Sequence, residues 1–149
     1  MRISYKTDYS LKIILYLSGC YPDDRAQIKK IAEELDIPKK FLEQVLLMLK
    51  SGGFLLSKKG PNGGYFLARP PRDISLGEVI RFVNGPIHPI SCIEPGQESS
   101  CDFAAKCVFR NVWQDVGAAI AGVIDILSFE DLVEKEACLI GNRSYDYQI

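Results

Sequence analysis

Hydrophobic residues recur at helical spacing three times within the first 51 positions of the chain. The first stripe covers residues 5 to 18 and ends at Gly19, the second covers residues 28 to 35, and the third runs from Phe41 to Leu49. The third follows Pro38, whose fixed φ suits the first position of a helix. Only Asp36 and Ile37 separate the second pattern from the third. Two helices joined by so short a turn predict a helix-turn-helix.

A hairpin and a further helix are predicted next. Residues 54 to 57 and 65 to 67 resemble strands, and the K-K-G-P-N-G-G stretch between them favours a hairpin loop. A hairpin in this place is the wing of a winged helix. Ser75 and Glu78 then form a capping-box pattern before an apolar stripe that ends at Val83. Residues 1 to 84 are therefore interpreted as a winged helix-turn-helix region.

The remaining chain contains a long loop and a long helix. Residues 85 to 107 are interpreted as an irregular cysteine-bearing loop, and residues 108 to 135 as a long helix of about six turns followed by a short one. The apolar stripe of the long helix has nearly heptad spacing, and such a helix is too long to be buried within so small a unit. We therefore expect it to pair with a second copy in an isologous homodimer. The stripe consists of Val108, Val112, Val116, Ala119, Val123 and Leu127. Residues 136 to 149 are expected to form a polar tail.

The predicted fold class is mainly α with a small β-hairpin wing, namely a winged helix-turn-helix plus a long C-terminal dimerisation helix. Charge divides along the chain in a way that suits this arrangement. Residues 1 to 72 hold 13 Lys and Arg against 7 Asp and Glu, whereas residues 73 to 149 hold 5 against 12, although the net charge is only -1. The N-terminus lacks the apolar core of a signal peptide and no apolar run is long enough to span a bilayer. We expect a cytoplasmic protein with no membrane partner.

The basic half carries residues suited to reading double-stranded DNA. In a helix-turn-helix the second helix enters the major groove, and side chains near its start reach the bases. Lys can donate to guanine, Gln can pair with adenine and Glu can accept from cytosine. Wing lysines and backbone N–H groups suit contact with phosphates or the minor groove. Singly each residue fits an ordinary solvated surface, but together they favour DNA. The candidate residues are Lys39, Lys40, Glu43, Gln44, Lys58, Lys59, Asn62, Gly63 and Gly64.

Three of the five cysteines lie close together in the sequence. Cys92, Cys101 and Cys107 bracket the long loop, and in a reducing compartment such thiols are more typical of metal or redox sites than of disulfides. Thiolates select iron–sulfur clusters, zinc or copper(I), and three of them require a fourth ligand. Cys20 and Cys138 are interpreted as buried or semi-buried thiols. His88 is the only histidine, and we interpret it as a solvated loop residue rather than a ligand.

The combined motifs resemble a known family. The sequences R-I-S-Y-K-T-D-Y-S (2 to 10), P-K-K-F-L-E-Q-V-L (38 to 46) and G-P-N-G-G-Y-F-L-A-R (60 to 69), followed by three Cys and Trp113, are similar to those of the IscR/NsrR/CymR family of bacterial winged-helix regulators. The resemblance covers nearly the whole chain. It implies a homodimer that binds a near-palindromic operator, and the three cysteines place the chain beside the cluster-binding members, because CymR-type members lack them.

The resemblance also suggests a fourth ligand. IscR-like members use a histidine three residues after the last Cys to hold a 2Fe-2S cluster, and this chain has Arg110 there. NsrR-like members hold a 4Fe-4S cluster with an aspartate from the first helix of the other subunit, and Asp8 matches that position. The resemblance therefore favours 4Fe-4S over 2Fe-2S, although the first gap between cysteines is longer here than in either type. Asp8 is equally explained as a helix-start acid favoured by the helix dipole.

The leading interpretation is a repressor whose operator affinity depends on an iron–sulfur cluster that senses nitric oxide, iron or redox state. A zinc or thiol switch that uses the same cysteines without iron is the first alternative. An electron-transfer or cluster-carrier protein is the second, but it would have no use for a helix-turn-helix and a lysine-tipped wing. The sequence has no phosphate-binding glycine loop, nucleophile elbow or paired His/Glu motif, so we expect no enzyme.

Overall fold

The computed structural model describes residues 2–22, 25–94 and 101–145, and this part of the chain contains six α-helices, three short 3-10 helices and one two-stranded sheet. The α-helices are α1 (Tyr5–Gly19), α2 (Ile28–Leu35), α3 (Lys39–Ser51), α4 (Leu76–Asn84), α5 (Val108–Ile124) and α6 (Phe129–Tyr145). The strands are β1 (Leu55–Lys58) and β2 (Gly64–Leu67), and the 3-10 helices are η1 (Pro71–Asp73), η2 (Ser91–Ile93) and η3 (Ala104–Lys106). The predicted fold class is confirmed. None of the helices described is long and apolar enough to cross a membrane.

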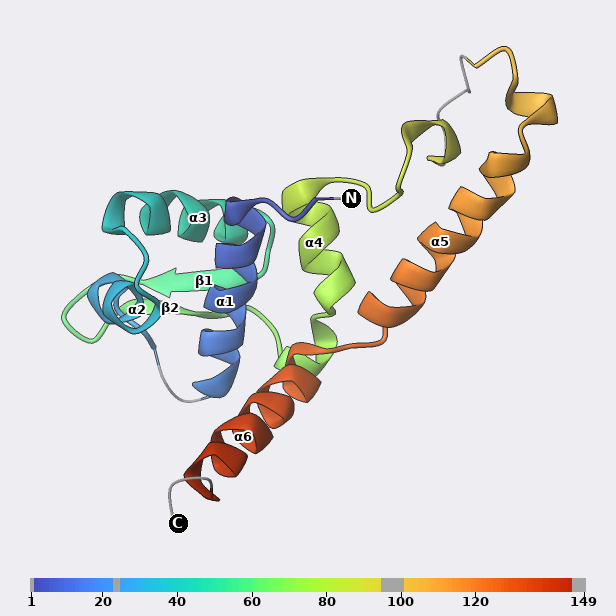
Figure 1. The fold of residues 1–149 in the computed structure, drawn as a ribbon. Helices are drawn as coiled ribbons and strands as arrows, with labels where there is room; N and C mark the ends of the chain where they lie inside the picture. Colours follow the sequence, from blue (N-terminus) through green and yellow to red (C-terminus); the bar gives the residue numbers. More distant parts are fainter. Residues whose placement is uncertain (1, 23–24, 95–100, 146–149) are drawn as a thin grey trace.

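Helices α2 and α3 form the helix-turn-helix and pack with α1 around one hydrophobic core (Figure 1). Asp36 ends α2 in the left-handed conformation, with φ 51°, and this turn directs the chain into α3 after two residues. Pro38 is the N-cap residue of α3 and not, as the sequence predicted, its first helical residue, because α3 begins at Lys39. The apolar stripe predicted for α3 is its buried face, because Leu42, Val45, Leu46 and Leu49 are all buried. The core therefore fixes which side of α3 remains free for a ligand.

The wing is a hairpin that is tied to the segment before α2. Strand β1 pairs antiparallel with β2, from Leu55 opposite Leu67 to Lys58 opposite Gly64. Tyr65 and Ala26 exchange backbone hydrogen bonds of 2.9 and 3.0 Å, which form an isolated antiparallel bridge between β2 and the segment before α2. Gly64 has φ +151°, and a Cβ on it would lie 2.6 Å from the Ala26 carbonyl oxygen. Glycine is therefore required here for the close approach of the two backbones.

Helix α4 begins as the capping motif predicts, but only half of the reciprocal bonding is present. The Ser75 hydroxyl oxygen accepts the Glu78 N–H at 3.1 Å. The Glu78 carboxylate accepts instead from the Arg69 guanidinium, which also lies over the Phe54 ring. The Glu78 side chain thus links α4 to Arg69 after the wing, instead of bonding back to the N-cap residue Ser75.

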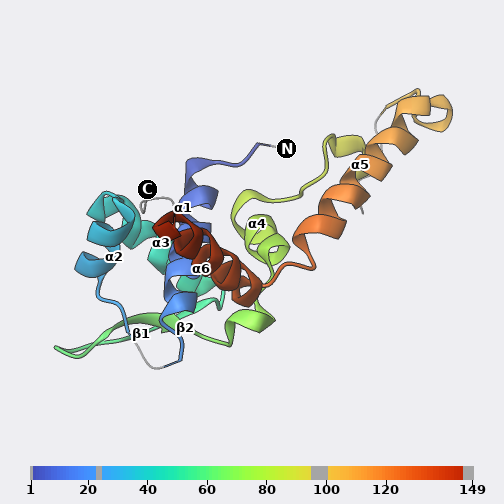
Figure 2. The same ribbon diagram turned by 60° about the horizontal axis from the view of Figure 1, so that its bottom comes forward.

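Helix α5 extends away from this body, and Figures 1 and 2 show it projecting in both views. Its predicted end at Leu127 is wrong, because α5 ends at Ile124 and Leu127 lies in the connection to α6. The Leu127 carbonyl accepts the Leu76 N–H at 2.8 Å, and Ser128 forms a β-bridge with Ser75. These contacts turn the chain back onto the start of α4, so the helix cannot continue.

An ion pair joins α4 to the end of α5. The two terminal nitrogens of the Arg81 guanidinium, Nη1 and Nη2, donate to the Asp125 carboxylate at 2.5 and 2.9 Å. This hydrogen bonding from Arg81 lowers the pKa of Asp125 below its ordinary value of 3.8. Gly77 leaves room for the pair, since a Cβ there would lie 1.9 Å from the Asp125 Oδ1 atom. The two helices are thereby fixed to each other at one end of α5.

We expect Asp125→Asn to lower the free energy of unfolding at neutral pH by less than about 1 kcal/mol, because both side chains of the ion pair are exposed. A carboxylate whose pKa is lowered in the folded state stabilises the protein above its unfolded pKa, and this contribution is lost as the pH falls through the folded pKa. The difference in melting temperature between the two proteins should therefore be present at pH 6 to 7, disappear in acid and be measurable by calorimetry. An equal difference in strong acid would contradict this account.

Helix α6 is longer than the short helix predicted, and it includes most of the region expected to be a tail. Ser128 and Asp131 form a reciprocal cap, in which Asp131 accepts the Ser128 N–H at 2.8 Å and Ser128 Oγ accepts the Asp131 N–H at 3.1 Å. The Ser128 hydroxyl, which also donates to the Asp131 carboxylate at 2.6 Å, and the Ser128 N–H together lower the pKa of Asp131. The first turns of α6 pack on α1, with Phe129 in the core, whereas residues 134 to 141 are exposed.

Candidate DNA-binding surface and cysteine site

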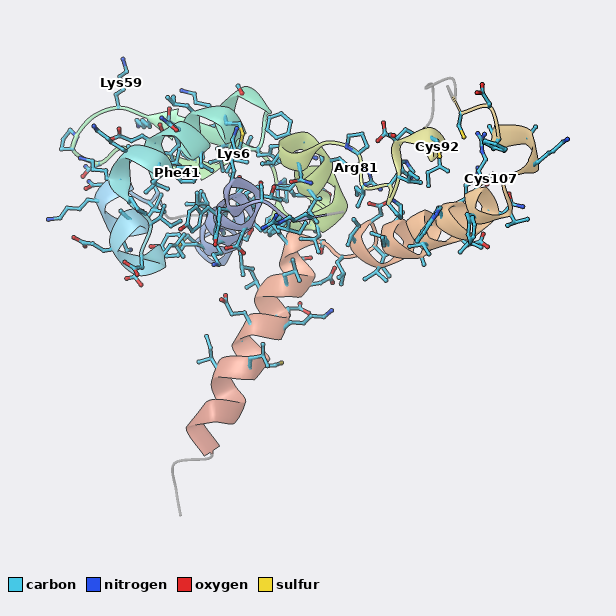
Figure 3. The ribbon with its side chains drawn as sticks, turned by 45° about the horizontal axis from the view of Figure 1, so that its top comes forward. Lys6, Phe41, Lys59, Arg81, Cys92 and Cys107 are labelled. Atoms are coloured by element: carbon cyan, nitrogen blue, oxygen red, sulfur yellow. The ribbon has the colours of Figure 1, made fainter. Side chains whose placement is uncertain are left out.

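Helix α3 and the wing enclose a surface hollow of about 540 Å³, which we call the wing hollow. One face of α3 lines it, with Lys39, Glu43 and Leu47 following one another by one turn. The start of α2 forms another side, where the Gln27 amide donates to the Pro61 carbonyl of the wing loop at 3.1 Å. Figure 3 shows Lys59 at the tip of the wing, pointing away from the body. The hollow is therefore built from three separate segments of the basic half.

Most of the residues predicted to contact DNA line the wing hollow, but not all of them. Those that line it are Lys39, Glu43, Lys58, Lys59, Gly63 and Gly64. Lys40, Gln44 and Asn62 are exposed beside it and do not line it. Gly63 is buried, and a Cβ on it would lie 2.2 Å from the Lys58 carbonyl oxygen, so its first role is to allow the tight wing turn. All nine residues nevertheless belong to α3 or to the wing.

The structure adds basic residues that sequence reasoning missed. Lys29 at the start of α2 and Lys50 at the end of α3 also line the hollow, and the Lys50 ammonium donates to Ser57 Oγ on β1 at 2.7 Å. With Lys39, Lys58 and Lys59 the described part of the lining holds five lysines, and Glu43 is the only acid among these described residues. Neutralisation of phosphates by such cations dominates the affinity of proteins for DNA. Charge and shape thus make this hollow suitable for a polyanion.

Helix α5 has three faces. Gly117 and Ile124 are buried toward the protein's own body, and Gln114 and Asp115 lie on an exposed polar side. The third face is apolar and exposed, and it contains five residues of the predicted dimerisation stripe: Val108, Val112, Val116, Ala119 and Val123. Phe109 and Trp113, which the prediction missed, are 65% and 39% exposed and widen this face. A contiguous apolar surface of this kind marks an interaction site.

The three predicted cysteine ligands lie toward the free end of α5. Cys107 is the N-cap of α5 and half-buried, Cys92 lies half-buried in η2, and Cys101 is exposed. Helix η2 contacts α5, and Figure 3 shows Cys92 and Cys107 at the same end of the molecule. Among the residues that the structure describes, no three His, Cys, Asp or Glu side chains are close enough to hold a metal ion. The cysteines thus share one region but do not form a ready metal site within one chain.

Asp8 and His88, the other two candidate ligand residues, lie elsewhere. Asp8 is in the first turn of α1, where its carboxylate accepts from the Lys12 ammonium at 2.7 Å. It lines a separate hollow of about 650 Å³ with residues 2 to 5. His88 is half-buried rather than a solvated loop residue, because it packs on α5 where a Cβ on Gly117 would lie 3.2 Å from its Nδ1 atom. His88 therefore attaches the loop after α4 to α5.

A helix-turn-helix with a wing, a lysine-lined hollow beside its second helix and a projecting apolar helix defines the class of winged-helix transcriptional regulators. The family model described as "Rrf2: Iron-dependent Transcriptional regulator" matches residues 3–135, and the chain belongs to this family. The predicted resemblance is thereby confirmed. The relatives are regulators, and the protein is not an enzyme.

Known relatives support the same family. The chain is 36% identical to an rrf2-like HTH-type transcriptional regulator of Rhodobacter capsulatus over 137 residues, which cover 88% of this chain and 91% of the relative. The fold of this chain is similar to the structure of CymR, the global cysteine regulator of B. subtilis. The TM-score is 0.75, the sequence identity is 29%, and the match covers 91% of this chain and 98% of the CymR chain. The fold is also similar to T. potens IscR, with a TM-score of 0.71, 28% identity and coverage of 91% and 88%.

Proposed function

We propose that the protein is a homodimeric repressor that binds a near-palindromic operator through α3 and the wing. The observation that carries the proposal is the wing hollow, whose five lysines surround one face of α3. The exposed apolar face of α5 supports a dimer, because the stripe from Val108 to Val123 is available in one chain and fits a second copy. Two α3 helices related by a two-fold axis would read two half-sites one helical turn apart.

The proposal includes control of operator affinity by an iron–sulfur cluster held by Cys92, Cys101 and Cys107. The chemistry of this donor set fits such a cluster, since it offers three thiols within 16 residues. Binding would have to draw the three thiols together, and the partner's α1 would supply Asp8 as the fourth ligand of a 4Fe-4S cluster. A bound cluster would supply a group that reacts with nitric oxide and oxidants.

Within this proposal, the chain itself carries the signal from the cysteines to α3. Cys92 lies in η2, which contacts α5, and His88 packs on Gly117 of the same helix. The segment from Gly85 to Ile93 connects this region to α4, which packs on α1. A change in how η2 sits on α5 is therefore transmitted to the helix-turn-helix through directly packed elements.

A zinc or thiol switch at the same three cysteines is the second candidate. It is favoured by the similarity to CymR, which is described as a cysteine regulator. Visible absorption of the anaerobically purified protein separates the two candidates. An iron–sulfur cluster colours the protein, whereas zinc or bare thiols leave it colourless.

The wing assignment is tested by replacing both Lys58 and Lys59 with Ala. We expect weaker binding to every DNA sequence and a salt dependence whose log–log slope is smaller by about 3.6 for the dimer, because two lost phosphate contacts in each subunit each remove about 0.9 from the slope. Titration of labelled DNA at several salt concentrations measures both. Unchanged affinity and slope would contradict contact between the wing and DNA.

A matched comparison is Gln44→Ala on α3. Gln44 is exposed beside the hollow, so this change should alter sequence preference by about 1–3 kcal/mol if Gln44 makes a bidentate contact with a base, and should leave the salt slope unchanged. The pair of variants thus separates phosphate contact from base reading.

A further inference from the structure

One residue of the wing hollow does not suit a polyanion. Leu47 is 60% exposed on α3, although the four leucines and valines around it on that helix, Leu42, Val45, Leu46 and Leu49, are fully buried. More than half of the Leu47 residue is therefore left outside the core. Isolated exposed leucines are common on proteins and need no explanation by themselves. The location of Leu47 is what distinguishes it, since it lies in the hollow among the lysines.

The position of Leu47 along α3 sets what it would meet. Lys39, Glu43 and Leu47 are four residues apart and occupy one face of the helix, and Lys50 follows on the same lining. Glu43 and Leu47 are neighbours one turn apart on the face of α3 that lines the hollow, so when Glu43 faces a base edge, Leu47 faces a neighbouring position in the same groove. The side chain has no hydrogen-bonding group, so it can recognise only an apolar group on a base edge.

The major groove offers one such group, the C5-methyl of a pyrimidine. Thymine carries it, whereas the other exposed groups of the base edges are hydrogen-bond donors and acceptors. 5-Methylcytosine presents the same methyl at the same position. We propose that Leu47 is a specificity-determining residue that contacts a C5-methyl group of one pyrimidine in each half-site of the operator. This inference rests on the proposed DNA-binding function and adds a base-reading residue to it.

The test begins with DNA selected from a random pool by the full-length protein. Each thymine of the selected site is then replaced by uracil, which removes only the methyl group. At one position in each half-site the replacement should weaken binding about fourfold, and about 16-fold when both half-sites are changed, from the burial of one methyl-sized group per site. The Leu47→Ala variant should bind the thymine and uracil forms equally at that position, and at the other thymines it should behave as the wild type does.

A cytosine arm distinguishes the two sources of the methyl group. Cytosine placed at the sensitive position should weaken binding, and 5-methylcytosine should bind the wild type more tightly than cytosine does but not the Leu47→Ala variant. If only 5-methylcytosine is discriminated and thymine is not, the ligand is methylated DNA rather than thymine.

Two further variants keep the test decisive. Leu47→Met retains an apolar side chain and should retain discrimination between thymine and uracil. Leu56→Ala removes an exposed leucine from β1 that lines a different hollow, and it should discriminate as the wild type does. Equal effects of every uracil replacement on the wild type and on Leu47→Ala would overturn the proposal. Failure of the wild type to select any sequence would instead overturn the proposed function.

Discussion

Val116→Asp is expected to convert the proposed dimer to a monomer. Val116 lies near the middle of the exposed apolar face of α5, so the folded single chain tolerates the substitution, whereas a dimer that buries this face would bury a charge without a partner. Loss of the dimer also removes simultaneous binding to two half-sites, which should lower operator affinity by about 10²-fold or more. Sedimentation velocity measures the first effect and DNA titration the second.

Gln114→Asp provides the control for the dimer experiment. Gln114 lies on the exposed polar side of the same helix, so it introduces the same charge outside the proposed interface and should leave the dimer intact. Circular dichroism would establish that both variants are folded. A folded Val116→Asp protein that sediments as a dimer would place the interface elsewhere.

Cys101→Ala is expected to abolish the visible absorption of the anaerobically reconstituted protein and its bound iron and sulfide. The reason is that the proposed 4Fe-4S cluster needs four ligands, and the site offers only three thiolates and one further ligand, so none can be lost. Cys138→Ala is the matched control. The prediction of a buried or semi-buried thiol was wrong for Cys138, which is exposed like Cys101 but lies on α6. This control variant should retain iron, sulfide and operator affinity.

The fourth ligand is examined in the same series. Asp8→Ala should make the cluster labile or change its type, and His88→Ala should retain it. Loss of the cluster in His88→Ala alone would show that Asp8 is the wrong ligand. A colourless wild-type protein with bound zinc, or with no metal at all, would contradict the cluster and support the switch without iron.

Local patterns in the sequence predicted most of the fold because the forces that create them are local. The Ser75 cap, the short turn at Asp36 and the wing glycines each act within a few residues. The end of α5 depends instead on Leu76 and Arg81, which lie more than forty positions earlier in the chain than their partners Leu127 and Asp125. No periodicity near residue 124 carries that information. The cap at Ser128 and Asp131 was readable as an S-x-x-D motif and would have predicted the start of α6.

The candidate site was predicted in part for the same reason. The residues of α3 and the wing that line the hollow were found because they adjoin the predicted turn and hairpin. Lys29, Lys50 and Leu47 were missed because their shared surroundings exist only after α2, α3 and the wing pack together. The cysteines were found by their chemistry, but their separation in space could not be read from their spacing.

The joint between α4 and α5 makes α5 a lever with its pivot at Asp125. The pair with Arg81 holds one end of the helix, and the cysteines lie at the other, about 25 Å away for 17 residues. A tilt of about 10° at the cysteine end, acting over this length, displaces one end relative to the other by about 4 Å. In the proposed dimer the two α5 helices hold each other, so such a tilt would swing the two DNA-binding bodies and change the distance between their recognition helices. Half-sites on B-DNA are spaced by about 34 Å, and a displacement of this size would take both helices out of register at once.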